Sequence, residues 1–453
     1  QDARRVARAV AALVRGRAEV DGLNRLVPDV GLEWDDVAVL RAYRRYRHQV
    51  APQDDEAYVD DVLVSHPALA RAAMDLWRAR TAPDEGDERR AAAEEAEAAA
   101  VALCDELVRL DHDRILRGLV GTIAATLRTN RHRGSGPALA LKLDPDRVPG
   151  LPAPRPFREV FVSGPTVEGV HLRGGPVARG GLRASDREQD FRTEVLGLLR
   201  AQVLKNALIV PTGAKGGFVL RGAAAETDGD RRREAVAEAY DTFVGALLDV
   251  TDDIEGDRVV PVPGRWDGDD PYLVIAADKG TSTFSDRANA LAEDRGFWLG
   301  DAFASGGSKG YDHKALGITA RGAWVAIGRH LRALGLDARR DEITVVGVGD
   351  MSGDVFGNGM LHSDRLRLVA AFDHRHVFID PDPDPETSYA ERRRLFDLPG
   401  SSWADYDPAV LSAGGIVHPR TAKVVPLGAE ARAVLRLDDE EPTPSEVIRA
   451  ILS

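Results

Sequence analysis

The sequence of 453 residues predicts an α/β multidomain protein with a helical N-terminal region, an α/β domain and a doubly wound nucleotide-binding domain. Apolar residues recur at helical spacing up to about residue 130. Residues 159–218 combine short apolar runs with glycine-rich segments. Residues 342–373 follow the order strand, glycine turn, helix, strand and acidic residue. We expect a helical region over 1–133, a linker over 134–156, an α/β substrate domain over 157–335 and a nucleotide-binding domain over 336–453.

The composition predicts a globular protein, with 43% hydrophobic and 29% charged residues. The net charge of -13 argues against a nucleic-acid partner, because such proteins carry a basic surface. The single cysteine, Cys104, excludes an internal disulfide framework and is typical of a reducing compartment, so we expect a cytoplasmic protein. No apolar run approaches the ~18 residues of a membrane span, so no membrane partner is expected.

The N-terminal region shows three apolar stripes that predict helices, namely Val6, Val10, Leu13 and Val14, then Val37, Leu40 and Tyr43, then Leu63, Ala70 and Leu76. Residues 84–100 are rich in alanine and glutamate without an apolar face, which indicates a solvated helix or a mobile connection. The histidines at 48, 66 and 112 are isolated, and no metal site is expected. Proline and glycine then mark the linker over 134–156.

The central segment, residues 159–218, places three cations in glycine-rich or strand-edge contexts. Arg179 stands before Gly180 and Gly181, Lys205 precedes an asparagine, and Lys215 lies in a Gly-Ala-Lys-Gly-Gly sequence. Glycine lets a backbone approach a ligand closely, so these cations predict a pocket for a small dianion. A phosphate-binding P-loop is excluded, because a glycine rather than Ser or Thr follows Lys215 and the upstream glycine spacing is absent.

A helix is expected between these cations. Ser185 and Glu188 have the spacing of a capping box, and apolar residues follow at helical intervals. Residues 207–210 are apolar and predict a short buried strand ending at Pro211. Lys205 would then lie where helix gives way to strand, and Lys215 in the turn after that strand.

Further along, the apolar run 272–277 predicts a buried strand that delivers Asp278 at its carboxyl end, where ligands of open α/β sheets gather. A role for Asp278 as the cap of the next turn is equally compatible with the pattern. Residues 306–310 match the G-x-S-x-G pattern of hydrolases around Ser308. The flanking sequence predicts neither the strand nor the helix that such a nucleophile needs, so we favour a glycine-rich loop closing over the substrate.

The nucleotide-binding prediction rests on two strands. A β-branched strand over 342–349 runs into Gly347 and Gly349, and a second strand over 366–372 ends at Asp373. An acidic residue at this place accepts ribose hydroxyls and repels a 2′-phosphate, which favours NAD. The basic residues at 374–376 leave NADP open. The expected Rossmann-type cofactor site comprises Gly347, Gly349, Asp350, Met351, Ser352 and Asp373.

Two motifs resemble the large NAD-specific glutamate dehydrogenases of bacteria: Pro176-Val-Ala-Arg-Gly-Gly-Leu-Arg183 and Lys205-Asn-Ala-Leu-Ile-Val-Pro-Thr-Gly-Ala-Lys-Gly-Gly217. The resemblance extends over nearly the whole chain. It implies a catalytic region that oxidises L-glutamate to 2-oxoglutarate and ammonia with NAD, in a homo-oligomer, with the active site between the substrate and nucleotide domains. It also implies a sequence truncated at both ends, with an incomplete nucleotide domain.

The resemblance assigns roles to individual residues. It implies that Arg179 and Lys205 bind the substrate carboxylates beside Gly180 and Gly181, and that Lys215 and Asp278 are catalytic. It also implies that Thr319 holds the nicotinamide amide. Neighbouring cations and partial burial are expected to lower the pKa of Lys215 so that it acts as a base.

Two alternatives remain open from the sequence. A dehydrogenase of another amino acid, such as leucine or phenylalanine, would share the two lysines and the aspartate, although two carboxylate partners favour glutamate. A non-catalytic fragment is the other alternative, since the nucleotide domain is expected to be incomplete.

Overall fold

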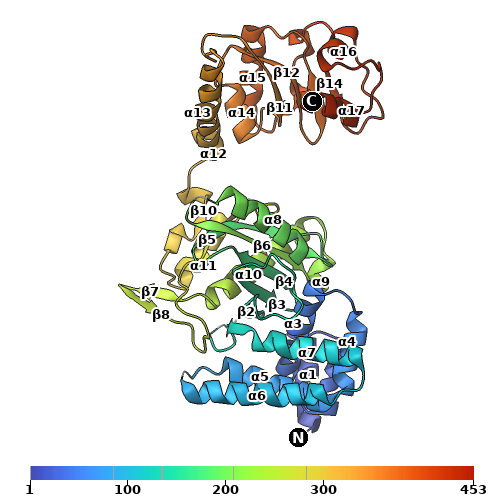
Figure 1. Ribbon diagram of the computed structural model, residues 1–453, viewed down its shortest axis with the longest axis vertical. Coiled ribbons are helices and arrows are strands. Elements are labelled where there is room, and N and C mark those ends of the chain that lie inside the picture. Colours follow the sequence, from blue (N-terminus) through green and yellow to red (C-terminus); the bar gives the residue numbers. More distant parts are fainter. Residues whose placement is uncertain (1, 85, 134–135, 208, 282) are drawn as a thin grey trace. The chain divides into compact units, whose positions relative to one another are not determined.

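The computed structural model describes residues 2–84, 86–133, 136–207, 209–281 and 283–453. The chain divides into two compact units, one ending at Gly310 and the other beginning at Tyr311 (Figure 1). No helix in the described ranges is long and apolar enough to cross a membrane.

The first unit begins with a helical region. Its α-helices are α1 (Asp2–Val14), α2 (Leu26–Val30), α3 (Trp34–Val50), α4 (Glu56–Ser65), α5 (Pro67–Thr81), α6 (Asp87–Asp105) and α7 (Leu110–Ala124). The second predicted stripe is buried on α3, and the third is buried but divided between α4 and α5, whereas Val10 and Val14 of α1 are exposed. Residues 87–105 form a true helix, because Ala93, Ala100 and Cys104 bury one narrow face of α6.

The expectation of isolated histidines is wrong for one pair in this region. His66 Nε2 and His112 Nδ1 lie 2.8 Å apart, which joins the α4–α5 corner to α7. Among the described residues, no three histidine, cysteine or acidic side chains are grouped so that they could hold a metal ion.

An eight-stranded mixed sheet forms the centre of the first unit, in the order β1-β2-β3-β4-β6-β5-β9-β10. The strands β1 to β4 are antiparallel neighbours, and β5, β6, β9 and β10 are parallel to one another. Their bounds are β1 (Thr126–Thr129), β2 (Leu139–Leu143), β3 (Arg158–Ser163), β4 (Val167–Arg173), β5 (Ala178–Ala184), β6 (Thr212–Leu220), β9 (Val274–Ala277) and β10 (Ala304–Ser305). A separate hairpin joins β7 (Asp253–Glu255) and β8 (Arg258–Val260).

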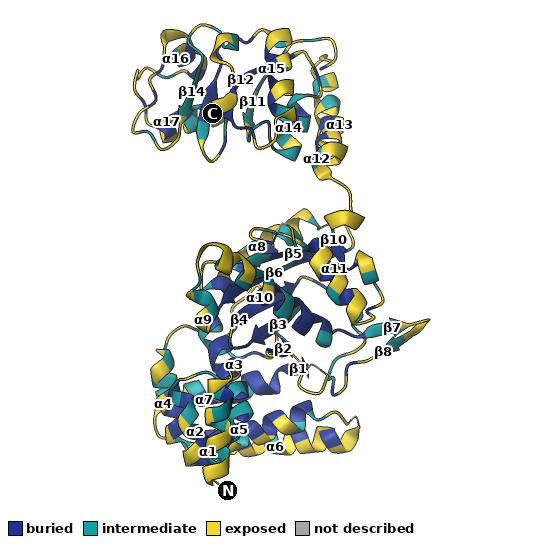
Figure 2. Ribbon diagram, turned by 180° about the vertical axis from the view of Figure 1, so that it is seen from behind, coloured by how far each residue is buried: buried dark blue, intermediate teal, exposed yellow. Residues whose placement is uncertain are grey.

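Helices cover both faces of this sheet, so its strands are largely buried (Figure 2). On one face, α8 (Phe191–Lys205) and the N-terminal helices share a hydrophobic core with Phe161, Leu172 and Val219. On the other, α10 (Gly229–Asp249) and α11 (Ser285–Asp294) pack against Leu182 and Phe218. The short α9 (Gly222–Ala225) follows β6. Because the helical region shares its core with the sheet, it is part of the first unit, and β1 and β2 lie inside the predicted helical and linker segments.

Two local predictions around α8 are wrong. The helix begins at Phe191 rather than at Ser185, because the Ser185 hydroxyl accepts from the Arg187 amide and donates to Glu194 instead of capping a helix. The apolar run at 207–210 forms no strand where it is described: Ile209 and Val210 are exposed, and Leu208 lies outside the described residues. The strand begins instead at Thr212, so Lys215 lies within β6 and not in a turn.

A buried network of charges fixes the segment that enters β9. Lys142 Nζ lies 2.7 Å from Asp270 Oδ2, and Arg173 Nη1 lies 2.6 Å from the same oxygen. Arg128 Nη1 lies 2.7 Å from Asp252 Oδ1, and both of these side chains are fully buried. Buried ions of opposite charge in such contact hold one geometry, so the strand that ends at residue 277 is anchored to β2 and β4.

The second unit contains a four-stranded sheet in the order β11-β12-β13-β14. The strands β11 (Ile343–Val348) and β12 (Leu366–Phe372) are parallel and are connected through α14 (Asp354–Met360), which confirms the predicted Rossmann-type βαβ order. β13 (His376–Ile379) and β14 (Ile416–Pro419) add antiparallel strands. The remaining helices are α12 (His313–Leu316), α13 (Ile318–Ala333), α15 (Pro385–Asp397), α16 (Ala429–Leu435) and α17 (Pro444–Leu452).

The division between the units differs from the expected boundary at 335/336. Trp324 of α13 belongs to a hydrophobic cluster with Ala338 and Leu366, and its indole N–H donates to the Gly359 carbonyl at 2.9 Å. The helix preceding β11 therefore packs within the second unit, although its sequence gives no sign of which sheet it covers.

Candidate active site

The first unit brings together two of the predicted catalytic residues. Lys215 projects from β6, and Asp278 follows the last residue of β9. Lys215 Nζ lies 2.9 Å from Asp278 Oδ2. Strand β5 lies between β6 and β9, so the lysine side chain crosses β5 to reach the carboxylate. Each side chain is 16% exposed, which leaves the pair accessible but partly desolvated.

Two glycines of β5 make this crossing possible for different reasons. A Cβ at Gly181 would lie 3.2 Å from Lys215 Nζ and 3.0 Å from Asp278 Cβ, so a side chain there would occupy the space in which the pair meets. A Cβ at Gly180 would lie 1.6 Å from the Ala214 carbonyl oxygen, so this glycine is required for the pairing of β5 with β6. Gly181 thus forms the floor of the site, and Gly180 supports it.

The other two predicted substrate cations lie at the opposite end of the same strands. Arg179 pairs with Gly213 across β5 and β6, and it lies on the same face as Gly181. A Cβ at Gly213 would touch Gln202 of α8, three residues before Lys205 on the same helix face. Both cations are exposed, and neither forms a hydrogen bond or ion pair with any described residue. Arg179, which has no partner among the described residues, therefore lies on the same face of β5 as the Lys215–Asp278 pair, two residues before Gly181.

The sequence interpretation missed Arg183 and Glu194. Arg183 Nη2 lies 3.1 Å from Asp278 Oδ1, and Arg183 Nη1 lies 2.8 Å from Glu194 Oε1 of α8. The motif that ends at Arg183 was recognised, but a sequence gives no sign that this arginine meets an aspartate 95 residues later.

Electrostatics favour the ionised form of Asp278. Burial by itself raises the pKa of this carboxyl group, but hydrogen bonds from Lys215, the Lys279 amide and Arg183 outweigh burial and lower the pKa below its usual value. Asp278 is therefore a carboxylate at neutral pH, able to accept a proton.

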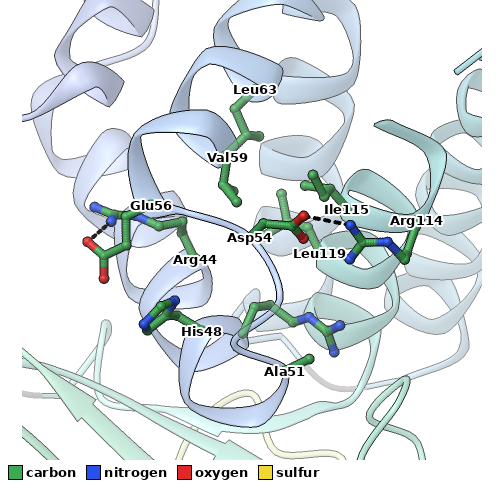
Figure 3. Close-up of a pocket in the computed structure, with 11 residues that line it drawn as sticks. Arg44, His48, Ala51, Asp54, Glu56, Val59, Leu63, Arg114, Ile115 and Leu119 are labelled. Atoms are coloured by element: carbon green, nitrogen blue, oxygen red, sulfur yellow. Dashed lines mark hydrogen bonds and ion pairs between the residues drawn. The ribbon is translucent and has the colours of Figure 1, made fainter. Parts of the chain in front are cut away.

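Two other places in the first unit, the loop at Ser308 and a small cavity, do not assemble comparable chemistry. The Ser308 hydroxyl donates to Asp286 at 2.9 Å within a short 3-10 turn, which is not the strand-to-helix elbow of a serine nucleophile. A cavity of about 40 Å³ between α3, α4 and α7 has room for only a few waters, and its Arg44 and Asp54 are paired with Glu56 and Arg114 (Figure 3).

In the second unit, the predicted cofactor residues gather at the carboxyl ends of β11 and β12. The Gly349 amide donates to the Phe372 carbonyl at 2.8 Å, which brings the two strand ends together. Gly349 has φ +138°, a conformation that favours glycine, and a Cβ at Gly347 would collide with Phe356. Asp350 accepts from the Ser352 amide at 2.9 Å, and Met351 is buried. Thr319 lies apart from this turn in sequence, exposed in the first turn of α13.

The two carboxylate oxygens of Asp373 differ in their hydrogen bonds. Its Oδ1 accepts from the Arg375 and His376 amides at 2.7 and 2.6 Å, which closes the turn between β12 and β13. Its Oδ2 is buried and forms no hydrogen bond with any described residue, although Arg375 Nε lies 3.9 Å from it. Burial raises the pKa of Asp373, yet the two amides and the neighbouring Asp350 lower it overall. A carboxylate oxygen at the end of β12 that lacks a hydrogen bond fits the ribose hydroxyls of a dinucleotide.

Comparison with known proteins shows the family of the chain. The family model described as "Bacterial NAD-glutamate dehydrogenase, catalytic domain" matches residues 100–453. The chain belongs to this bacterial NAD-glutamate dehydrogenase family. A second model, "Glutamate dehydrogenase, helical motif 3", matches residues 18–83 within the helical region.

Relatives of this family member include three NAD-specific glutamate dehydrogenases. Those of Mycobacterium tuberculosis and Pseudomonas aeruginosa are 53% and 51% identical to it over 99% and 97% of this chain. That of Halomonas elongata is 50% identical over 96% of this chain. The chain spans 29%, 28% and 28% of the lengths of these relatives.

Proposed function

We propose that this region catalyses the NAD-dependent oxidative deamination of L-glutamate to 2-oxoglutarate and ammonia. The observation that carries this proposal is the Lys215–Asp278 pair, set on the glycine floor of β5, with Arg179 two residues before Gly181 on the same face of that strand. A substrate with two carboxylates and an amine needs two fixed cations and a proton acceptor, and this face of the sheet supplies both.

Arg179 and Lys205 are the proposed carboxylate partners. A guanidinium binds a carboxylate through two parallel hydrogen bonds, so Arg179 fixes orientation as well as charge. Arg179 and Gly181 are two residues apart, roughly 7 Å along the strand, which separates a bound carboxylate from the reacting amine. An aliphatic or aromatic side chain would leave one of the two cations without a partner, and this favours glutamate over leucine or phenylalanine.

Lys215 and Asp278 would carry the proton transfers. Asp278 Oδ2 accepts a proton from the substrate ammonium group, and the resulting amine assists departure of the hydride from Cα. Once Lys215 has released its own proton, Nζ takes a proton from the water that adds to the iminium carbon. Asp278 then returns its proton to the nitrogen, which leaves as ammonia, and the regenerated carboxylate takes the hydroxyl proton as the carbonyl forms.

The second unit would hold the cofactor. NAD, when bound, supplies the acceptor for the departing hydride. Asp373 would accept hydrogen bonds from the ribose hydroxyls through Oδ2. The pyrophosphate would be contacted by the turn that comprises Gly347, Gly349, Asp350, Met351 and Ser352. Thr319 would bond the nicotinamide amide. The family membership also supports a cytoplasmic homo-oligomer, which size-exclusion chromatography with light scattering would test.

The activity is tested by the formation of NADH from a panel of amino acids, using the full-length protein and this chain side by side. We expect glutamate to be oxidised at a far higher kcat/KM than leucine, phenylalanine or aspartate. The Asp278→Asn variant, which keeps the shape of the side chain, should be strongly impaired. Equal oxidation of leucine and glutamate, or full activity of the variant, would contradict the proposal.

A further inference from the structure

Arg183 joins the reacting carboxylate to the helix that covers the site. Its Nη2 lies 3.1 Å from Asp278 Oδ1 and its Nη1 lies 2.8 Å from Glu194 Oε1. The Ser185 hydroxyl donates to the second oxygen of Glu194 at 2.5 Å. Since Lys215 occupies Asp278 Oδ2, each oxygen of Asp278 faces its own cation. The result is a row of alternating charges that runs from Glu194 through Arg183 and Asp278 to Lys215.

Burial makes these contacts strong. The side chains of Arg183, Glu194 and Asp278 are 19%, 17% and 16% exposed, so little water competes for the hydrogen bonds between them. The nearby Arg187–Asp190 pair contrasts with this row, because its side chains are 52% and 47% exposed and the Arg187 guanidinium is hydrogen-bonded to Asp190. Exposed pairs of that kind contribute little, whereas a partly buried guanidinium on a carboxylate fixes both its charge and its orientation.

A purely structural role for Arg183 would require only the contact with Glu194, which ties β5 to α8. The second contact goes instead to the oxygen of Asp278 that Lys215 leaves free. The other groups facing Asp278 are the Lys279 amide, which donates to Oδ1 at 2.8 Å, and Thr281, whose hydroxyl accepts from the Asp278 amide. The Lys279 ammonium points elsewhere, toward Asp186 at 3.4 Å. Arg183 is therefore the cation that stays on Asp278 when Lys215 turns to the substrate.

We infer that Arg183 is a positioning residue that keeps Asp278 ionised and oriented through the reaction, and that Glu194 moderates this effect by sharing the guanidinium. The inference rests on the proposed function of the same site. With Oδ1 held by Arg183, only Oδ2 is free to take the proton from the substrate nitrogen and to return it when ammonia leaves. Lys215 can then move away from Asp278 without leaving that carboxylate unpaired.

Three variants of the full-length protein test this role: Arg183→Gln, Glu194→Gln and the control Arg187→Gln. The measurement is the pH dependence of kcat/KM for glutamate. In the parent protein, kcat/KM should fall at low pH as Asp278 takes up a proton, which gives a low-pH break in the profile. Loss of the guanidinium should move this break upward by about one pH unit. Loss of the Glu194 charge should move the same break downward, because a neighbouring negative charge is removed. The Arg187 variant should follow the parent profile.

Opposite displacements cannot arise from loosening of α8, which would affect both variants in the same direction. Circular dichroism checks that all three variants fold. A profile of Arg183→Gln that superimposes on the parent, or shifts of the same sign in the Arg183 and Glu194 variants, would overturn the inference.

A second measurement does not depend on turnover. Lys215 is acetylated with acetic anhydride at a series of pH values, and the extent of acetylation is measured by mass spectrometry. The reaction follows the fraction of Lys215 that is deprotonated. We expect the midpoint to rise in Arg183→Gln, to fall in Glu194→Gln and to stay unchanged in Arg187→Gln. If the parent protein forms no NADH from glutamate, the proposed function fails. The labelling result alone then decides whether Arg183 controls the pair, and equal midpoints in all variants would refute that control.

Discussion

Lys215 Nζ and Asp278 Oδ2 lie 2.9 Å apart across strand β5, at the point where β5 carries Gly181. The contact joins two strands that are not neighbours, so it depends on the absence of a side chain on the strand between them. The geometry of the candidate site is thus set by backbone packing as much as by the two charged residues.

The first prediction separates the two glycines. Gly181→Ala should fold normally but reduce turnover about 10–100-fold, because its Cβ would lie 3.2 Å from Lys215 Nζ and displace the lysine. Gly180→Ala should instead lower stability severely, because its Cβ would lie 1.6 Å from a backbone oxygen of β6. Thermal unfolding and steady-state kinetics of both variants distinguish the two effects. Normal turnover in Gly181→Ala would show that the lysine position is not critical.

Part of this site was predictable from the sequence. The run at 272–277 and the strand at 366–372 are bounded by polar residues, so their ends, Asp278 and Asp373, could be placed at strand ends. The glycines around Lys215 were misread as a turn. They serve close packing instead, since a Cβ at Gly217 would lie 2.5 Å from Val195 of α8. Local patterns do not distinguish glycines that bend a chain from glycines that admit a neighbouring helix.

The partners of charged residues were not predictable at all. Glu194 and Asp278 lie 11 and 95 residues from Arg183, and nothing in the spacing of these three residues indicates contact. The capping-box pattern at Ser185 was misleading for a related reason, because tertiary contact with Glu194 outcompetes a local cap.

The second prediction concerns substrate binding. Lys205→Ala should raise the KM for glutamate about 10–100-fold with little change in kcat, since one charge-assisted hydrogen bond to a carboxylate is lost. Arg200→Ala provides the control, because it removes an exposed cation from the same helix. An equal change of KM in both variants would indicate a general effect of charge and not a binding contact.

The third prediction concerns the cofactor. Asp373→Asn keeps the acceptor for the Arg375 and His376 amides but removes the negative charge at Oδ2, which forms no hydrogen bond with the described residues. The ratio of kcat/KM for NAD to that for NADP should therefore fall by about tenfold, because repulsion of a 2′-phosphate is lost. Kinetics with both cofactors check this result. An unchanged ratio would remove Asp373 from cofactor selection.

The fourth prediction concerns pH and stability. Burial, together with Asp21 and Glu56, raises the pKa of Asp60 to about 6, although Arg44 and Arg41 oppose the shift. A carboxyl group with a raised pKa in the folded state contributes stability below about pH 4, and this contribution is lost as the pH rises through about 6. The Asp60→Asn variant has no carboxyl group to ionise, so it does not lose this stability as the pH rises. Its stability relative to the parent should improve by about 2 kcal/mol between pH 4 and pH 7, as measured by urea unfolding. A constant difference would contradict the shifted pKa.

Turnover of the Lys215→Ala variant of the full-length protein is the most direct test of the proposed mechanism. A positioned base contributes about 10²–10⁴-fold to a rate, so kcat for glutamate oxidation should fall by a factor in this range. The affinity for NAD should stay nearly unchanged, because Lys215 lies in the first unit and the proposed cofactor residues lie in the second. The limb of the parent pH–rate profile that belongs to the lysine should disappear. Near-normal turnover of a correctly folded Lys215→Ala protein would contradict the account.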